Sequence, residues 1–379
     1  MKNRFMLNYN RIFICVLLIC VASCSPSQSQ KLVQLPGKPI SNSLDSSQAQ
    51  VVYKYVKNFP NGTEIAIAFL NGDSTKYVGI RRRNDSLIYV ENREAVFEIG
   101  SITKTFTAAM LAELVYNNKV DLNEPIKNIL PVQLHQSSLN GKEVTLLHLA
   151  NHTSGFPKEP DNVFFDWSIP GSPYKFYDTA KLYDYLSKRI TLLSTPGTKR
   201  EYSNLGGGLL GHLLTLITGT SYENLLGKLI CKPLDMRNTF VSLNNIGANQ
   251  LIPGRDPNGN VVQNWELNVL VGGGGIKSSA EDMAKYLRAQ MMDTTFYLMT
   301  QQPTFKYTGN NFAGLGWTWF AIDNFKFVSA TGGTGGYSCC VIFERGTKKA
   351  IVLLTNVSAF LASKDDPISN MSIELHKSL

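Results

Sequence analysis

Residues 100–104, Gly100-Ser101-Ile102-Thr103-Lys104, open the stretch that decides both the fold and the chemistry of this chain. The run that follows, residues 105–115, contains neither Gly nor Pro and is apolar around most of its circumference. This pattern predicts a helix that is buried on most sides. A serine and a lysine three residues apart share one helix face, so the Lys104 amine can reach the Ser101 oxygen. The stretch therefore predicts a serine nucleophile activated by a buried lysine.

The Ser-x-x-Lys pattern also arises by chance in a chain of this length, and it occurs a second time as Ser172-Pro173-Tyr174-Lys175. Pro and Gly surround this second copy, so it offers no sustained helix face that would hold the lysine over the hydroxyl. We interpret it as a loop. Only the copy at Ser101 is expected to form a reactive pair.

Length and composition indicate a folded protein of substantial size. The chain has 379 residues, of which 43% are hydrophobic and 17% are charged. A chain of this length can bury a large core, either as one large domain or as two closely packed ones. Such a composition excludes a disordered chain.

The N-terminus is typical of an export signal. Lys2, Arg4 and Arg11 precede the apolar run 12–21, which is too short to span a membrane. We predict a signal peptide over residues 1–23. Its removal lowers the formal charge from +8 to +5, and no basic stripe with interleaved aromatics remains. Arg81-Arg82-Arg83 is best explained as a solvated strand end, so nucleic acid is excluded as a partner.

The signal ends in Val21-Ala22-Ser23-Cys24, which resembles the bacterial lipobox. The resemblance implies a lipid on Cys24 and a membrane anchor; an ordinary secretory signal is the alternative. Ser25 after the cysteine resembles lipoproteins that go on to the outer membrane of Gram-negative bacteria. We therefore expect an exported, periplasm-facing membrane lipoprotein. Residues 24–48, rich in Ser, Gln and Pro, are expected to be a tether.

The three cysteines that remain, Cys231, Cys339 and Cys340, allow at most one disulfide. Adjacent Cys339 and Cys340 point to opposite faces of a strand, so stability does not depend on a disulfide framework.

Strand patterns lie at both ends of the remaining chain, which we treat as one domain over residues 49–379. Residues 64–70 and 76–80 form a predicted hairpin around Asn71-Gly72-Asp73, and a third apolar stretch covers 87–90. Further strands are predicted over 315–322, 325–328, 337–343 and 350–354, before a closing helix at 371–377. Residues from about 120 to 300 are mostly helical patterns and loops. This order predicts an α+β fold with one antiparallel sheet built from both chain ends, flanked by helices and carrying an inserted helical region.

Two further motifs follow the Ser101 stretch in the chain, Tyr202-Ser203-Asn204 and Thr331-Gly332. Together the three motifs resemble the serine β-lactamase and penicillin-binding-protein superfamily, on the class C side, where Tyr-x-Asn replaces Ser-x-Asn. The segments 97–101, 146–155, 202–206 and 332–337 also resemble family segments in family order. The resemblance covers about residues 50 to 360, and it implies a β-lactamase/transpeptidase-like fold.

The resemblance implies a role for each motif residue. Ser101 attacks a carbonyl and forms an acyl-enzyme, while Lys104 and Tyr202 share the task of taking its proton. Neither is a base in its ordinary state at neutral pH, so their surroundings must favour the deprotonated forms as a coupled pair. Asn204 holds Lys104 and the substrate amide. The backbone N–H groups of Ser101 and Gly333 bind the oxyanion, with Thr331 and Gly332 completing the third motif.

One position departs from the family pattern. Ala330 stands where members usually carry Lys or His before the Thr-Gly pair. That cation would help ionise Tyr202 and would bind a substrate carboxylate, so we expect weaker β-lactam hydrolysis and a more alkaline optimum. Thr331, Thr334 and Lys277 are the residues considered for partial compensation.

Other motifs carry less weight. His148 and His152 are four apart but lack the glutamate of a metalloprotease and a third ligand. The run 272–278 lacks the glycine that precedes the lysine of a phosphate loop, and Gly336-Tyr337-Ser338 lacks the closing glycine of a nucleophile elbow. We expect no metal and no cofactor. Three functions remain open: hydrolysis of β-lactams, D-alanyl peptides or related amides; hydrolysis of small acyl esters; and non-catalytic binding of cell-wall peptides.

Overall fold

The computed structural model describes residues 43–163, 172–322, 325–358 and 366–379. The predicted signal peptide, Cys24 and the tether as far as residue 42 lie outside these residues. All described residues fall in a single unit rather than two. No helix in these ranges has the length and apolar character needed to cross a membrane.

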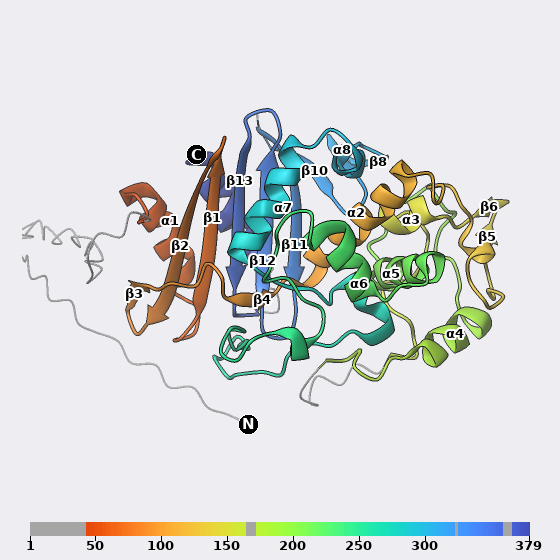
Figure 1. Ribbon diagram of the computed structural model, residues 1–379, viewed down its shortest axis with the longest axis horizontal. Coiled ribbons are helices and arrows are strands. Elements are labelled where there is room, and N and C mark those ends of the chain that lie inside the picture. The colour runs from red at the N-terminus through yellow and green to blue at the C-terminus, as the bar shows by residue number, and fades with distance from the viewer. Residues whose placement is uncertain (1–42, 164–171, 323–324, 359–365) are drawn as a thin grey trace, which may run out of the picture. The chain divides into compact units, whose positions relative to one another are not determined.

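A nine-stranded sheet joins the two ends of the domain (Figure 1). Its strand order is β3-β2-β1-β13-β12-β11-β10-β9-β8, and every neighbouring pair is antiparallel. The N-terminal strand β1 pairs directly with the C-terminal strand β13, for example Ile67 with Leu353. This antiparallel sheet from both chain ends, flanked by helices, confirms the predicted α+β fold.

The strands of the large sheet have the following bounds: β1 Glu64–Asn71, β2 Ser74–Arg83, β3 Ser86–Tyr89, β8 Phe305–Thr308, β9 Asn311–Ala313, β10 Thr318–Ile322, β11 Phe325–Gly333, β12 Ser338–Glu344 and β13 Lys349–Thr355. Two small sheets comprise β4 (Val96–Glu98) with β7 (Lys277–Ser279), and β5 (Ser138–Leu139) with β6 (Lys142–Glu143).

The helices have these bounds: α1 Ser46–Val56, α2 Thr103–Tyr116, α3 Leu146–Ala150, α4 Thr179–Lys188, α5 Asn204–Thr218, α6 Tyr222–Leu226, α7 Ala280–Met292, α8 Phe296–Gln301 and α9 Pro367–Lys377. Short turns of other helix types are η1 Gly100–Ile102, η2 Ile126–Asn128, η3 Gly227–Cys231, η4 Leu243–Asn245 and η5 Asn268–Gly273.

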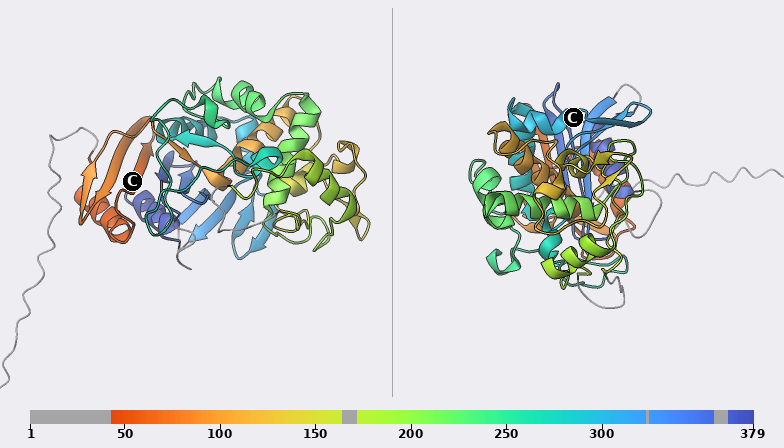
Figure 2. Two further views of the ribbon diagram at one scale, coloured as in Figure 1. Left: turned by 90° about the horizontal axis from the view of Figure 1, so that it is seen from below. Right: turned by 90° about the vertical axis from the view of Figure 1, so that its right-hand side faces the viewer.

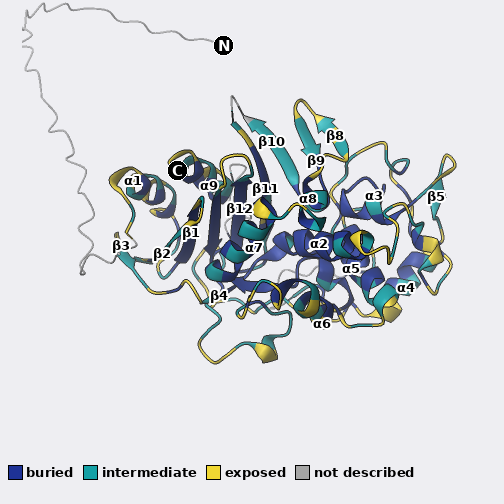
Figure 3. Ribbon diagram, turned by 45° about the horizontal axis from the view of Figure 1, so that its top comes forward, coloured by how far each residue is buried: buried dark blue, intermediate teal, exposed yellow. Residues whose placement is uncertain are grey.

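The central strands are buried on both faces because alternate side chains enter two separate cores. In β1, Ala66, Ala68 and Leu70 join the core on the α2 side, whereas Ile65, Ile67 and Phe69 join the core beneath α1 and α9. Cys339 and Cys340 follow the same rule, one in each core, and both are free thiols. The burial of strands β1 and β12 on both faces is visible in Figure 3.

Helix α2 connects the sheet to the helical region. Every residue from Thr103 to Ala112 is buried, which confirms the predicted burial on most sides. Helices α3, α4, α5 and α6 gather beyond α2, away from β1 and β13, whereas α7 packs on the sheet (Figure 1; Figure 2 gives two further views). The start of α2 therefore lies where strands and helices meet, and this junction holds the candidate site.

Several boundaries differ from those predicted. Helix α1 begins at Ser46, inside the expected tether, because Asp45 and Gln48 form a reciprocal capping box and Val52 and Val56 are buried. Strand β11 extends to Gly333, past its predicted end at residue 328. Strands β8 and β9 were not predicted, since their burial is only partial and their apolar alternation is weak.

Candidate active site

The Ser-x-x-Lys pair forms as predicted at the start of α2. Ser101 lies in η1, one short turn ahead of the helix, and Lys104 lies in the first turn of α2. The Lys104 Nζ is 3.0 Å from the Ser101 Oγ. The lysine side chain is buried, so its polar end needs partners within the protein.

Two carbonyl oxygens meet that need. Lys104 Nζ donates to Asn204 Oδ1 at 2.8 Å and to the backbone carbonyl of Gly273 at 2.6 Å. With two hydrogen atoms committed to these acceptors, the remaining position on the nitrogen faces Ser101. The same heavy-atom arrangement accommodates a neutral amine that accepts the serine proton and an ammonium that donates to the serine oxygen.

The second motif reaches Ser101 from the start of α5. Ser203 caps this helix by accepting from the Gly206 N–H, which places Tyr202 just before the helix and Asn204 at its first residue. The Tyr202 hydroxyl lies 2.6 Å from the Ser101 Oγ. The Lys104 Nζ lies 4.8 Å from the centre of the Tyr202 ring. Alcohol, amine, phenol and carboxamide thus meet at one point, as the sequence predicts for these four residues.

Close backbone contact between α5 and η5 delivers the Gly273 carbonyl. A Cβ atom on Gly211 would lie 2.7 Å from the Gly272 Cα, a separation that side chains do not tolerate. Thr107 anchors the same turn by donating to the Gly272 carbonyl at 2.8 Å. The glycine run 272–275, which resembles a phosphate loop in composition only, therefore packs against a helix and supplies an acceptor to Lys104.

The third motif forms the opposite wall of the site. Gly332 in β11 passes so close to the start of η1 that a Cβ there would lie 2.9 Å from the Ser101 backbone nitrogen. Gly333 follows and lines the same pocket as Ser101. This close approach brings together the two segments whose backbone N–H groups are the predicted oxyanion donors. Thr331 is exposed on the strand.

None of the residues considered for compensation brings a cation into the described lining of the pocket beside Ser101. The partly buried Ala330 packs on the core that contains Val328, on the α2 side of the sheet. Lys277 is buried, and its Nζ donates to the carbonyls of Val241, Trp265 and Gly275, each at 3.0 Å. Of the residues considered for compensation, only Thr334 is among those that line the pocket.

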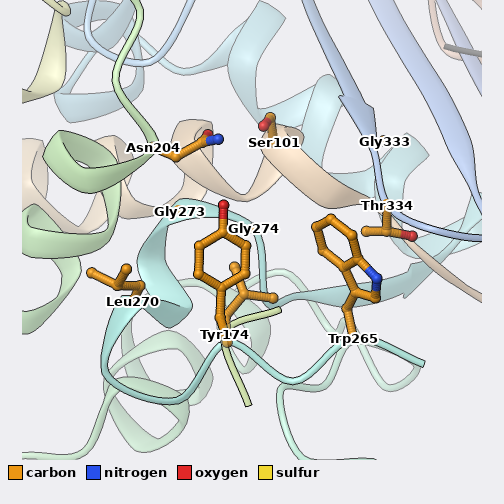
Figure 4. Close-up of a pocket in the computed structure, with 10 residues that line it drawn as sticks. Ser101, Tyr174, Asn204, Trp265, Leu270, Gly273, Gly274, Gly333 and Thr334 are labelled. Carbon is orange, nitrogen blue, oxygen red and sulfur yellow. The ribbon is translucent and has the colours of Figure 1, made fainter. Parts of the chain in front are cut away.

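The pocket beside Ser101 has an aromatic wall that the sequence did not predict. Figure 4 shows the rings of Tyr174 and Trp265 below Ser101, with the Tyr174 hydroxyl directed toward Asn204. The two rings meet edge to face, with centroids 5.9 Å apart. The described lining is completed by Asn204, Leu267, Leu270, Gly273, Gly274, Gly333 and Thr334, and it contains no cationic side chain. The aromatic wall, together with the leucines, gives the pocket an apolar floor.

His152 supports the phenol of Tyr202. Its ring packs on the Tyr202 ring with centroids 4.6 Å apart, and its Nδ1 accepts from the Ser203 N–H at 3.2 Å. Burial, with the nearby charges of Lys104 and Arg200, lowers the pKa of His152 well below its usual value. This histidine is therefore neutral at physiological pH and positions the ring without adding charge.

Arg200 is a largely buried cation near the phenol. It stacks over the Tyr307 ring at 4.5 Å, and its Nη2 donates to Thr318 Oγ1 at 3.2 Å. Burial lowers its pKa, opposed by the interaction with Tyr307 and Tyr202. Its charge therefore acts on the same phenol that the missing residue-330 cation would have served.

Glu159 is a carboxylate that sequence reasoning missed. It accepts a hydrogen bond from Asn204 Nδ2 at 2.5 Å. Burial raises its pKa, whereas hydrogen bonds from Asn204 and Tyr174 and the charge of Lys104 lower it. A lone glutamate in a Pro-rich loop carries no pattern that could have identified it before the loop was seen beside α5.

The alternatives weighed from the sequence lie elsewhere or serve the fold. Ser172 donates to the Glu266 carbonyl and Lys175 pairs with the Glu266 carboxylate, so this second copy forms no Ser–Lys pair. His148 accepts from the Thr145 N–H and helps to cap α3. His152 instead contacts Tyr202 and Ser203, so the two histidines do not act as a pair. Within the described ranges, no three His, Cys, Asp or Glu side chains gather in a way that would hold a metal ion.

Comparisons with known proteins agree with this geometry. The model of the family described as Beta-lactamase matches residues 77–369. The chain is 27% identical over 310 residues to a D-alanyl-D-alanine-carboxypeptidase/endopeptidase AmpH of Escherichia coli K12, covering 74% of each protein. It is 26% identical over 339 residues to a beta-lactamase of Pseudomonas fluorescens, covering 77% of this chain and 88% of that one.

Solved structures share the fold. A class C beta lactamase from Rhodobacter sphaeroides superposes with a TM-score of 0.70 at 21% identity, covering 88% of this chain and 99% of that one. A beta-lactamase/D-alanine carboxypeptidase from Yersinia pestis gives a TM-score of 0.69 at 23% identity, covering 87% and 97%.

Proposed function

Because the chain belongs to the β-lactamase family, we propose that it is a serine hydrolase that forms an acyl-enzyme at Ser101. The substrates are β-lactams, D-alanyl peptides or related amides, the classes named for its relatives. The observation that carries the proposal is the position of the Ser101 Oγ, 3.0 Å from Lys104 Nζ and 2.6 Å from the Tyr202 hydroxyl. An alcohol becomes a nucleophile when a base within hydrogen-bond reach takes its proton.

Lys104 and Tyr202 act together as that base. Ser101 Oγ attacks the substrate carbonyl carbon as its proton passes to the pair, and the pair then returns a proton to the leaving nitrogen or oxygen. A water molecule then loses a proton to the same pair and attacks the acyl carbon; the bond between that carbon and Ser101 Oγ breaks, and the pair returns the proton to Ser101 Oγ. The heavy-atom contacts of Lys104 fit both an amine and an ammonium, so this side chain can take a proton and return it without leaving its place.

The oxyanion is bound by backbone donors. The N–H groups of Ser101 and Gly333 are the two assigned to it, and the close passage of β11 past η1 supports that assignment. Donors fixed before the substrate arrives stabilise the developing charge without having to reorganise.

Ester hydrolysis is the second candidate, and Ala330 favours it. An ester needs no cation for a carboxylate beside the scissile bond, and the described pocket lining offers none. The chemistry at Ser101 is otherwise the same, because both reactions pass through the same acyl-enzyme.

The test is a substrate panel: a chromogenic cephalosporin, p-nitrophenyl acetate and a D-alanyl-D-alanine peptide. We expect turnover of at least one, lost in Ser101→Ala by about 10²-fold or more. Ser187→Ala, which removes a hydroxyl that bonds within α4, is the matched control and is expected to retain activity. Equal turnover by Ser101→Ala and the unmodified chain would overturn the proposal.

We also propose that the protein is exported and anchored through lipid on Cys24, a position outside the described residues. In cells fed a labelled fatty acid, the label should enter the intact chain and be absent from Cys24→Ser. Equal labelling of both forms would contradict the anchor.

A further inference from the structure

Glu159 is fixed to the active site by the backbone that carries it. The Lys158 carbonyl accepts from the Asn204 N–H at 2.9 Å and from the Leu205 N–H at 3.2 Å. The Ser203 hydroxyl donates to the Pro157 carbonyl at 2.7 Å. These bonds bind the loop to the first turn of α5, so the carboxylate has a set position relative to Asn204.

The Asn204 side chain joins Glu159 to the reacting group. Its Oδ1 accepts from Lys104, which contacts Ser101, and its Nδ2 donates to the Glu159 carboxylate. Both ends of the carboxamide are thereby assigned, with the oxygen toward the lysine and the nitrogen toward the acid. A negative charge stands directly behind the residue assigned to the acyl part of the substrate.

The pocket in front of Asn204 suits a cation. Tyr174 and Trp265 line the pocket with aromatic rings, whose faces attract ammonium groups. The described lining holds no cationic side chain, and the Lys104 nitrogen is already engaged with Asn204 and Gly273. A substrate carboxylate or carbonyl at this position would face a fixed negative charge, whereas a protonated amine would be attracted.

Resting on the function proposed above, we infer that Glu159, Asn204 and the two aromatic rings form a subsite for a protonated amine on the acyl part of the substrate. The substrate class is then an aminoacyl amide or ester with a free amino group next to the scissile carbonyl. Such an amine is two bonds from the carbonyl carbon that Ser101 attacks. It therefore reaches the pocket wall formed by Asn204 and Tyr174, and the Glu159 carboxylate acts on it from behind Asn204.

The experiment compares two chromogenic amides that differ only at the amine: D-alanine p-nitroanilide and its N-acetyl derivative, at pH 7. At this pH an α-amino group is mostly protonated. For the unmodified chain we expect kcat/KM to be at least about tenfold higher for the free amine. Glu159→Gln keeps the shape and removes the charge, and we expect the ratio to fall by about tenfold, chiefly through a higher KM for the free amine.

Asp161→Asn is the matched control, since it removes an exposed acid of the same loop that pairs with Arg189. It is expected to leave the ratio unchanged. Equal kcat/KM for the two anilides in the unmodified chain, or the same ratio in Glu159→Gln, would overturn the subsite. Thermal unfolding of each variant separates loss of the subsite from loss of the fold.

Failure of the subsite and failure of the proposed function give different results. If both anilides are hydrolysed equally and Ser101→Ala abolishes both, the hydrolase stands and the amine subsite is refuted. If the chain hydrolyses neither anilide nor any member of the substrate panel, the proposed function itself is refuted, and the subsite with it.

Discussion

Replacing Gly332 with alanine should disable the site while leaving most of the fold intact. An added methyl carbon would lie 2.9 Å from both the Ile99 carbonyl carbon and the Ser101 nitrogen, and closer still to the Ile99 carbonyl oxygen. Non-bonded heavy atoms prefer separations of about 3.5–4.0 Å, so β11 and η1 must move apart by about 1 Å. All three clashing atoms belong to the backbone, and no side-chain rotation can relieve the contact.

The expected loss of activity follows because this movement separates the two backbone N–H groups assigned to the oxyanion. Gly333 follows Gly332 directly, so its N–H moves away from the Ser101 N–H. Misplacement by 1 Å costs about 10²-fold in rate, and loss of one oxyanion donor costs about 10²–10³-fold. We therefore expect kcat for the best panel substrate to fall by about 10²–10³-fold in Gly332→Ala. Overpacking should also lower the free energy of unfolding by about 1–3 kcal/mol.

The assay is steady-state turnover well below the melting temperature of each variant. Gly346→Ala is the control, because a Cβ on this glycine meets no atom within 4 Å and its φ is not positive. It should retain turnover and stability. Gly332→Ala with kcat within about threefold of the unmodified chain would refute the assignment of the third motif to the oxyanion.

Three further predictions follow from individual contacts. Tyr202→Phe removes the hydroxyl that lies 2.6 Å from Ser101 Oγ. The kcat should fall by about 10²–10⁴-fold, the range for a lost general base, with an unchanged circular dichroism spectrum. Retained turnover would exclude the Tyr202 phenol as part of the general base. Ala330→Lys supplies a cation on the α2 side of β11. It should raise cephalosporin turnover relative to ester turnover and shift the pH optimum of turnover toward neutral. A neutral pH optimum with fast cephalosporin turnover in the unmodified chain would contradict our interpretation of Ala330. His152 has a lowered folded-state pKa, so below about pH 6.5 the unfolded chain binds the extra proton and stability falls with pH. The free energy of unfolding should therefore fall less between pH 7 and pH 5 in His152→Phe than in the unmodified chain, as measured by urea denaturation, and identical pH dependence would contradict the buried neutral state.

The sequence predicts the parts of the fold that follow regular periodicity. Short apolar runs in the segments that became β1, β12 and β13 identified strands at both chain ends, and the uninterrupted apolar run after Lys104 identified the buried helix. The side chains of these strands and of this helix are buried on more than one side, so their sequences are apolar over most of their length. The capping box of α1 was not predicted because the surrounding sequence is rich in Ser and Gln.

The candidate site was predictable only where residues form local motifs. Ser101 and Lys104 share one helix face, and Tyr202 and Asn204 share one helix start, so spacing alone brings each pair close. Glu159 and the Gly273 carbonyl reach the site through tertiary contacts across α5. A backbone carbonyl has no sequence signature, and a single glutamate is ordinarily a solvated surface residue. Such partners emerge only when the packing of the loops is known.

Trapping the acyl-enzyme tests the nucleophile most directly. The purified chain is incubated with a penicillin, stopped within seconds, and measured by intact mass and by mass of its proteolytic peptides. We expect an added mass equal to the whole penicillin on the peptide that contains Ser101, and none in Ser101→Ala. An adduct on a different residue, or the same adduct in Ser101→Ala, would contradict the assignment of Ser101.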